Sequence, residues 1–187
     1  VVFKNPNNEE SLNIEDAVKD IASISPEKLK FSSYNEGENK ELETKVKVTR
    51  TPTIAILDKD GNFAGLKYSS LPSGHELNSF ILGLYNVAGP GQKVAPESLE
   101  KIKKINKPIN IKIGVSLSCT KCPKTVQATQ RIATLNKNVE MEMINIFTFQ
   151  DFKNRYDIMS VPAIIVDDQH VYFGEKTVED MLEIINK

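Results

Sequence analysis

Two cysteines separated by two residues are the part of the chain whose spacing points most directly to chemistry. They are Cys119 and Cys122, with Thr120 and Lys121 between them, and the 187-residue sequence holds no third thiol. Two thiols at this spacing can close a disulfide and reopen it by thiol–disulfide exchange. Cys119 would be the exposed nucleophile that attacks a partner's disulfide, and Cys122 would resolve the mixed disulfide by attacking Cys119.

The elements predicted around the pair favour this chemistry. Residues 109–117 alternate between apolar and other side chains and are rich in β-branched residues, which predicts a strand. Residues 123–136 carry apolar side chains at helical spacing, and Pro123 suits the first turn of a helix. A helix N-terminus presents free N–H groups and about half a positive charge, which stabilises a thiolate. Lys121 adds a positive charge nearby, and we count Thr120 and Lys121 among the residues that contact a substrate.

Two other interpretations of the cysteines stay open. A zinc site would need two more ligands, and only His75 and His170, from distant parts of the sequence, could join the sulfur atoms. A purely structural disulfide at this spacing would close too short a loop to stabilise the chain much. We therefore expect a redox-active pair and no metal ion.

The second half of the sequence predicts the element order β-α-β-α-β-β-α. After the strand and helix that flank the cysteines come further alternating strands and two helices that open on capping-box patterns. These are the strands at 139–147, 163–166 and 171–173, and the helices that begin at 148–151 and 177–180. Parallel strands joined by helices and followed by a hairpin predict a mixed β-sheet covered by helices, of the α/β class.

The first half repeats this order in weaker form, which indicates an internal duplication. Its strands are expected at 1–3, 29–34, 53–57 and 63–68 and its helices at 14–24 and 73–87, with a polar segment at 36–47 in the place of the second helix. Where the cysteine loop would stand, residues 5–9 contain no thiol, so this half cannot perform dithiol chemistry.

Glycine and proline cluster between the two halves, at residues 89–96, and mark a boundary. A charged linking helix is expected at 97–106. We therefore divide the chain into a first fold at residues 1–88, a linker with its helix at 89–108, and a second fold at 109–187.

A proline precedes the third strand of each half. These are Pro52 after Thr51 and Pro162 after Val161, and each stands where a cis peptide could form, although a trans proline is the commoner case. If Pro162 is cis and lies next to Cys119, the Val161 backbone could pair with an extended segment of a substrate. Val161 and Pro162 are therefore candidate substrate-binding residues.

Glu76 has two interpretations. The run Ser73-Gly-His-Glu76 matches a capping box, in which the glutamate side chain reaches back to the Ser73 N–H. By spacing alone this structural role is favoured over catalysis.

Composition excludes several classes of function. The formal net charge is −1 and charged residues make up 26% of the chain, which argues against a nucleic-acid binder that neutralises phosphates. No apolar stretch approaches the ~20 residues of a membrane span, so we expect no membrane partner. The N-terminus lacks both a signal-peptide pattern and a methionine. We therefore expect a fragment or a processed chain, and a cytoplasmic location.

Several motifs together resemble the N-terminal domain of the flavoprotein subunit of bacterial alkyl hydroperoxide reductase. They are Ser-Leu-Ser-Cys-Thr-Lys-Cys-Pro at 116–123, Ser-Leu-Pro-Ser-Gly-His-Glu at 70–76, Thr-Phe-Gln at 148–150 and Ser-Val-Pro-Ala at 160–163. The likeness runs from about residue 64 to the C-terminus. The Thr120-Lys121 pair departs from the intervening pair associated with enteric members, and this difference could tune the reduction potential.

The resemblance implies two tandem thioredoxin-like folds, of which only the second keeps its cysteines. It implies electron transfer from NADH through FAD and a second dithiol, in a flavoprotein disulfide reductase or a missing C-terminal domain, to Cys119–Cys122 and then to the disulfide of a peroxiredoxin. It also implies that Glu76 is a buried acid that assists proton transfer at the thiols. No dinucleotide-binding fingerprint is present, so we expect this chain itself to bind neither FAD nor NADH.

Two alternative functions remain beside this electron relay. The first is a general thioredoxin- or glutaredoxin-like reductant of protein disulfides. The second is a docking module without catalytic activity, which would use its fold to recruit partners.

Overall fold

The second half of the chain contains the predicted series of helices and strands, and the first half contains one helix more than predicted. The computed structural model describes residues 1–186. In the first half the elements are β1 Val2–Lys4, α1 Glu9–Ser23, β2 Ser33–Asn35, α2 Lys40–Val46, β3 Thr53–Leu57, β4 Phe63–Ser69, the 3-10 turn Gly74–Glu76 and α3 Leu77–Ala88. The linking helix is α4 Pro96–Lys103, and the second half contains β5 Ile109–Val115, α5 Cys122–Leu135, β6 Val139–Asn145, α6 Gln150–Arg155, β7 Ala163–Val166, β8 His170–Phe173 and α7 Val178–Ile185.

The strands of the two halves repeat one pairing pattern. The first half has the order β2-β1-β3-β4 and the second the order β6-β5-β7-β8. In each, the first two strands pair in parallel, and the third and fourth are antiparallel to their neighbours. This repetition confirms the tandem thioredoxin-like architecture predicted from the sequence. The limits of the two folds at residues 88 and 109 stay a prediction.

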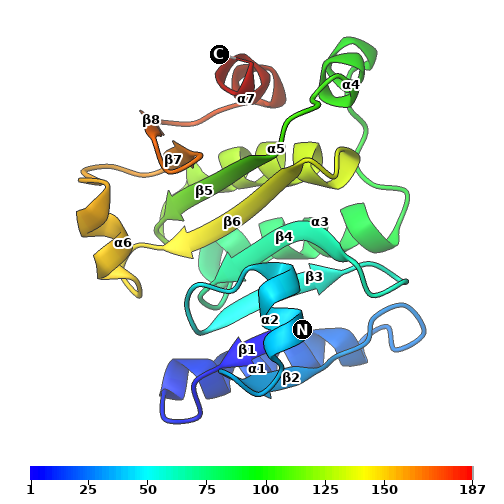
Figure 1. Ribbon diagram of the computed structural model, residues 1–187, viewed down its shortest axis with the longest axis vertical. Coiled ribbons are helices and arrows are strands. Elements are labelled where there is room, and N and C mark those ends of the chain that lie inside the picture. The colour runs from blue at the N-terminus through cyan, green and yellow to red at the C-terminus, as the bar shows by residue number, and fades with distance from the viewer. Residues whose placement is uncertain (187) are drawn as a thin grey trace.

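The two four-stranded units form one continuous eight-stranded sheet, which the sequence did not predict. An edge strand of each unit makes the junction, because β4 pairs in parallel with β6 from Leu66 opposite Met141 to Ser69 opposite Ile144. In Figure 1 the sheet runs through the whole molecule, with α1, α3 and α5 behind it and α2 in front. The largest apolar core lies between the sheet and the helices behind it, with Tyr68, Phe80 and Ile132 among its buried members.

Three elements of the first half differ from the sequence expectation. Helix α1 begins at Glu9 rather than at residue 14, because the Asn8 side chain accepts a hydrogen bond from Ser11 N–H and caps it. Strand β2 is shorter than expected. The polar segment does form a helix, α2, which is capped by Asn39 and buries Val46 against Phe3. The sequence did not predict this helix, because most of its residues are polar and only the side that packs on the sheet is apolar.

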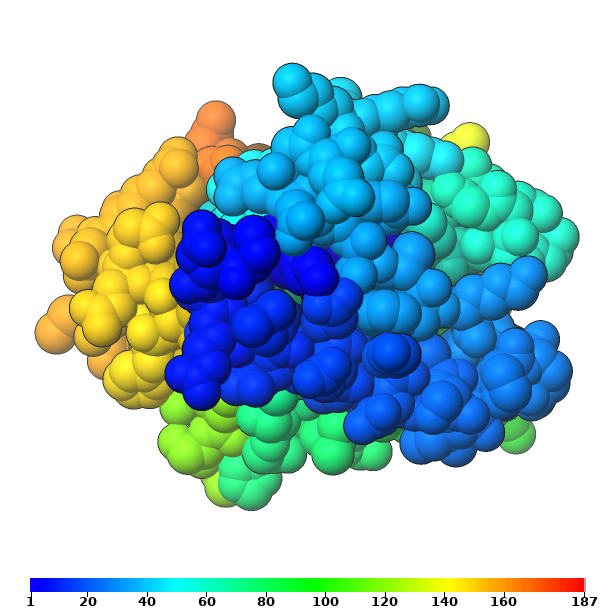
Figure 2. Space-filling model, turned by 90° about the horizontal axis from the view of Figure 1, so that it is seen from below, coloured from blue at the N-terminus to red at the C-terminus, as the bar shows by residue number. Residues whose placement is uncertain are grey.

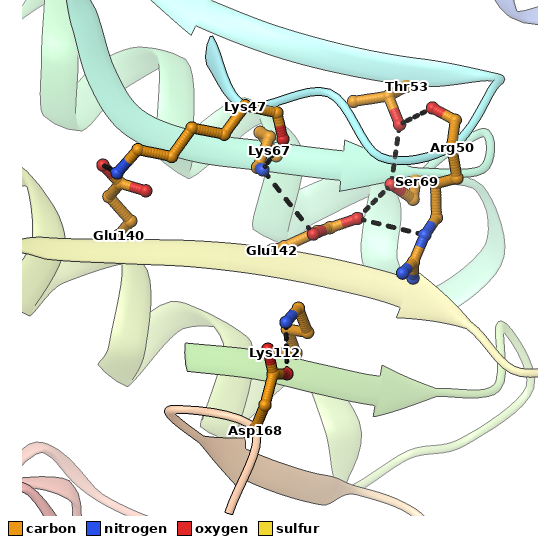
Figure 3. A network of polar contacts seen from close by, with 9 residues as sticks. All are labelled: Lys47, Arg50, Thr53, Lys67, Ser69, Lys112, Glu140, Glu142 and Asp168. Carbon is orange, nitrogen blue, oxygen red and sulfur yellow. Dashed lines mark hydrogen bonds and ion pairs between the residues drawn. The ribbon is translucent and has the colours of Figure 1, made fainter. Parts of the chain in front are cut away.

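Charged and polar side chains join the two halves on the sheet face opposite α3 and α5. Glu142 of β6 is 1% exposed and accepts a hydrogen bond from Ser69 Oγ of β4 at 2.6 Å. The same carboxylate forms ion pairs with Arg50 Nε at 3.6 Å and Lys67 Nζ at 3.7 Å (Figure 3). These contacts cross the β4–β6 junction, so a buried cluster of charges connects the two units.

The N-terminal residues also contact the second half directly. Figure 2 views the molecule from the end formed by the first half, and the yellow and orange segment around α6 borders the dark blue N-terminal residues. Thr148 Oγ1 donates a hydrogen bond to Glu10 Oε1 at 3.1 Å across this border. Thr148 is therefore not the cap of α6, whose N-terminus has no side-chain cap. The capping box expected at residues 148–151 was wrong, whereas the one from Thr177 to Asp180 is present.

Within residues 1–186, no helix combines the length and the apolar character that crossing a membrane requires.

Candidate functional site

Cys119 and Cys122 form a disulfide at the start of α5. Their Cα atoms are 5.5 Å apart. Cys119 lies in the turn after β5 and is half-buried, whereas Cys122 is the first residue of the helix and is fully buried. The N–H of Cys122 donates a hydrogen bond to Cys119 Sγ at 3.1 Å. A thiolate at Cys119 would keep this donor, so the geometry fits Cys119 as the nucleophile and Cys122 as the resolving thiol.

The other residues predicted around the disulfide differ in their exposure. Thr120 and Lys121 are exposed beside Cys119. The carbonyl oxygen of Val161 lies 3.9 Å from Cys119 Sγ. Val161 is half-buried, Pro162 is buried, and the peptide bond between them is cis. The fold therefore brings together two loops that are some 40 residues apart in the sequence, with Val161 next to the sulfur atom.

Glu76 does not act in a capping box. The Ser73 side chain makes no cap hydrogen bond, and Glu76 ends a short 3-10 turn that leads into α3. This turn packs against the loop before Cys119, where the His75 N–H donates to the Leu117 carbonyl at 3.1 Å. Gly74 has φ +56°, and a Cβ atom there would lie 2.6 Å from the same carbonyl oxygen. Glycine is needed at this position, and it lets the first half carry Glu76 to the dithiol loop.

The carboxyl group of Glu76 lies in a dry environment. Its residue has no exposed surface, and among the described residues neither carboxylate oxygen has a hydrogen-bond partner. Burial raises the pKa of Glu76 to about 7. A carboxyl group with this pKa can both donate and accept a proton near neutral pH.

Sequence reasoning missed a set of polar residues around Glu76. Tyr68, Ser79 and Gln130 are fully buried between β4, α3 and α5, and the pKa of Tyr68 is raised, chiefly by burial and further by the charge of Glu76. A signal was available in the sequence, because Gln130 follows Val126 by four residues and so takes a position that a helix starting near Cys122 turns toward its core.

The residues of the alternative metal site do not converge. His75 and His170 are both exposed. In the described part of the chain, no group of three or more His, Cys, Asp or Glu side chains is arranged to hold a metal ion. In the first half, the loop equivalent to the cysteine loop is engaged in local hydrogen bonds, since Asn5 N–H donates to Ser11 Oγ and Asn8 caps α1.

Comparison with known sequences points to one family. Residues 109–186 match the family described as a thioredoxin domain. The alkyl hydroperoxide reductase protein AhpF of Staphylococcus epidermidis is 33% identical over 139 residues, which cover 74% of this chain and 27% of that protein. The chain thus spans about a quarter of the length of the curated relatives that it matches first.

Solved structures extend the likeness over nearly the whole chain. The N-terminal domain of alkyl hydroperoxide reductase AhpF from Enterococcus faecalis is 35% identical with a TM-score of 0.93, covering 98% of this chain and 88% of that chain. A protein disulfide oxidoreductase from Aeropyrum pernix shares the fold with a TM-score of 0.88 at 22% identity, over 98% of this chain and 82% of its own. The chain is therefore a thioredoxin-like disulfide redox module, and it belongs to the family of the N-terminal domain of alkyl hydroperoxide reductase AhpF.

Proposed function

We propose that this chain relays electrons from a flavoprotein disulfide reductase to the disulfide of a peroxiredoxin, through thiol–disulfide exchange at Cys119 and Cys122. The observation that carries the proposal is the position of the disulfide at the start of α5, with one sulfur atom accessible and bonded to a helix N–H. Membership of the AhpF family supports the choice of donor and acceptor. FAD and NADH would bind to the reductase part, outside this chain, in the same cytoplasmic system.

The reaction begins when a dithiol of the reductase supplies two electrons and two protons and opens the Cys119–Cys122 disulfide. The Cys119 thiolate then attacks the partner's disulfide, forming one S–S bond while the partner's own S–S bond breaks and its leaving sulfur takes a proton. Next, Cys122 loses its proton and attacks Cys119, which releases the second partner sulfur as a thiol. The chain regains its disulfide, and the partner has gained two electrons and two protons.

Each residue of the site has a role in this sequence of steps. The Cys122 N–H stabilises the Cys119 thiolate. Glu76 donates a proton to the leaving sulfur and accepts one from Cys122, which a pKa of about 7 permits in both directions. The Val161 backbone, next to Pro162, pairs with the extended segment that carries the partner's sulfur, and Thr120 and Lys121 contact the rest of that segment.

The proposal is tested by reconstituting the relay. The chain in catalytic amount is mixed with NADH, a flavoprotein disulfide reductase, an oxidised two-cysteine peroxiredoxin and a hydroperoxide, and NADH oxidation is followed. We expect turnover that depends on this chain and falls to background with Cys119→Ser. Turnover that persists with Cys119→Ser would overturn the mechanism. Faster reduction of an unrelated disulfide protein such as insulin than of the peroxiredoxin would instead establish a general disulfide reductase.

A further inference from the structure

Arg50 reaches from the first half of the chain onto α6 of the second half. It lies in the loop between α2 and β3, and its guanidinium carbon lies 5.4 Å from the centre of the Phe149 ring and 5.3 Å from that of Phe152. A guanidinium within about 6 Å of a ring centre is attracted to the ring face. Phe149 directly precedes α6 and Phe152 lies within it. Arg50 is therefore attached to this helix by two cation–ring contacts.

The ion pair with Glu142 does not by itself explain this arrangement. An arginine that is built to bind a carboxylate commonly donates two parallel hydrogen bonds to it. Here only Nε of Arg50 approaches Glu142 Oε1, and the distance of 3.6 Å is too long for a hydrogen bond. Among the described residues, the buried Nη1 of Arg50 has no hydrogen-bond partner. The guanidinium is thus placed for the two rings rather than for the carboxylate.

The two rings belong to a small apolar core beneath α6 that also involves Val161. Phe152 is 2% exposed in this core, and Phe149 and Val161 pack against it. A Cβ atom on Gly114 of β5 would lie 3.3 Å from Phe152 Cε1 and 3.1 Å from Ile158 Cδ1, so the packing leaves no spare room. Close-packed interiors transmit the displacement of one side chain to its neighbours. A shift of Phe152 is therefore passed on to the rest of this core.

The segment from Ile158 to Val161 depends on this core for its position. Met159 is 90% exposed and Ser160 is exposed as well, so the segment is held at its two ends. At one end, Ile158 is buried in the core. At the other end, the carbonyl oxygen of Val161 lies 3.9 Å from Cys119 Sγ.

We propose that Arg50 is a positioning residue for the binding of the partner's segment. By fixing α6, it keeps the Val161 backbone beside Cys119 in the geometry that pairing with an extended segment needs. The half without cysteines thereby takes part in partner binding. This inference rests on the role of Val161 in the proposed function.

A structural role as a counter-charge of Glu142 is the competing explanation, and Lys67 separates the two. Lys67 Nζ pairs with the same carboxylate at 3.7 Å, on the other side from Arg50 (Figure 3). Among the described residues, Lys67 lies over no aromatic ring. Arg50→Met and Lys67→Met each remove one cation from Glu142, but only Arg50→Met removes the ring contacts of α6. If Arg50 serves Glu142 alone, the two variants should behave alike.

Two measurements compare these variants. In the NADH-coupled relay with the reductase in excess, we expect Arg50→Met to raise KM for the oxidised peroxiredoxin about five-fold and to change kcat less than about two-fold, because binding of the partner is weakened. In the oxidised chain alone, the amides of residues 156–161 should exchange with deuterium about five-fold faster. Lys67→Met should leave both values at those of the wild type. Alkylation of reduced Cys119 by iodoacetamide should be the same in both variants, because this small reagent does not pair with the Val161 backbone.

The outcomes separate this inference from the relay itself. Equal increases of KM with Arg50→Met and Lys67→Met, or wild-type KM and exchange with Arg50→Met, would overturn the inference. If Arg50→Met does not fold, Phe149→Leu takes its place, because it removes one ring and no charge. Phe149→Leu should also raise KM, and an unchanged KM with it would overturn the inference. The exchange measurement needs no partner, so it judges Arg50 even if the relay fails, and the relay is judged by the loss of turnover with Cys119→Ser.

Discussion

At the scale of single residues, Glu76 shows that one sequence pattern can fit two different physical roles, of which the fold allows only one. Its spacing from Ser73 fits a capping box, but the fold turns the carboxyl group inward, where it finds no hydrogen-bond donor among the described residues. Ionising it costs free energy because the charge is removed from water. A site that keeps such a group for proton transfer therefore carries a cost in stability at neutral and alkaline pH.

This cost can be measured through the Glu76→Gln variant. The folded-state pKa is about 7 and the ordinary value is 4.5, so the folded chain binds the proton more tightly. The stabilisation from this proton is complete below pH 4.5 and is lost as the pH rises to 7. We therefore expect Glu76→Gln to raise the free energy of unfolding of the oxidised chain by about 3 kcal/mol at pH 8, and by little near pH 4.5.

Urea denaturation at several pH values provides the measurement. Glu183→Gln removes an exposed carboxylate from α7 and should change stability little at any pH. A difference between wild type and Glu76→Gln that stays the same from pH 4.5 to pH 8 would contradict the assignment of a raised pKa.

At the scale of elements, the 3-10 turn before α3 matters because it carries Glu76 to the dithiol loop. Gly74 and Gly61 both have positive φ, at +56° and +76°. A Cβ atom on Gly61 would meet nothing within 4 Å, whereas one on Gly74 would lie 2.6 Å from the Leu117 carbonyl oxygen. We expect Gly61→Ala to cost about 1 kcal/mol from backbone conformation alone, and Gly74→Ala to cost about 2 kcal/mol more.

Activity separates these two variants further. Because the Gly74→Ala substitution must displace the turn from Leu117, it should also slow the relay, while Gly61→Ala should not. Unfolding free energies and NADH-dependent turnover measured on both variants check this expectation. Equal effects of the two substitutions would show that the close approach of Gly74 to Leu117 does not position the site.

Capping patterns show where sequence reasoning succeeds and where it fails for single elements. Three segments carry the same capping-box pattern, and only the one at Thr177 forms it. The side chain of Thr148 donates a hydrogen bond to Glu10 instead. Glu76 is buried at the end of a 3-10 turn that packs against α3 and α5. A local pattern predicts that a helix starts nearby, but it cannot weigh partners that come from distant parts of the chain.

At the scale of the whole molecule, the joining of two thioredoxin-like units is what places the turn that ends at Glu76 against the loop before Cys119. Alternation and β-branched residues predicted the strands and their repeated order. They could not predict that edge strand β4 pairs with edge strand β6, because hydrophobic period identifies a strand and not its neighbour. The dithiol itself was predictable, since its two residues are close in sequence, whereas the surroundings of Glu76 depend on this long-range pairing.

The buried charges at the junction should contribute strongly to stability. Glu142 is almost fully buried with Arg50 and Lys67, so Glu142→Gln would leave those two cations without their shared counter-charge. We expect a loss of about 3 kcal/mol in the free energy of unfolding. Glu140, two residues earlier on the same face, pairs with Lys47, whose side chain is 62% exposed, so Glu140→Gln should cost less than about 1 kcal/mol. Urea denaturation of both variants measures these losses. Equal losses in the free energy of unfolding would contradict a special role for the buried cluster.

The relay through Cys119 is tested most directly by trapping its covalent intermediate. The reduced Cys122→Ser variant is incubated with an oxidised two-cysteine peroxiredoxin, and the products are separated without reductant and mapped by mass spectrometry. We predict a one-to-one complex joined through Cys119 and dissolved by dithiothreitol, with none formed by Cys119→Ser. Absence of this complex with Cys122→Ser, or its formation with Cys119→Ser, would contradict the proposed function.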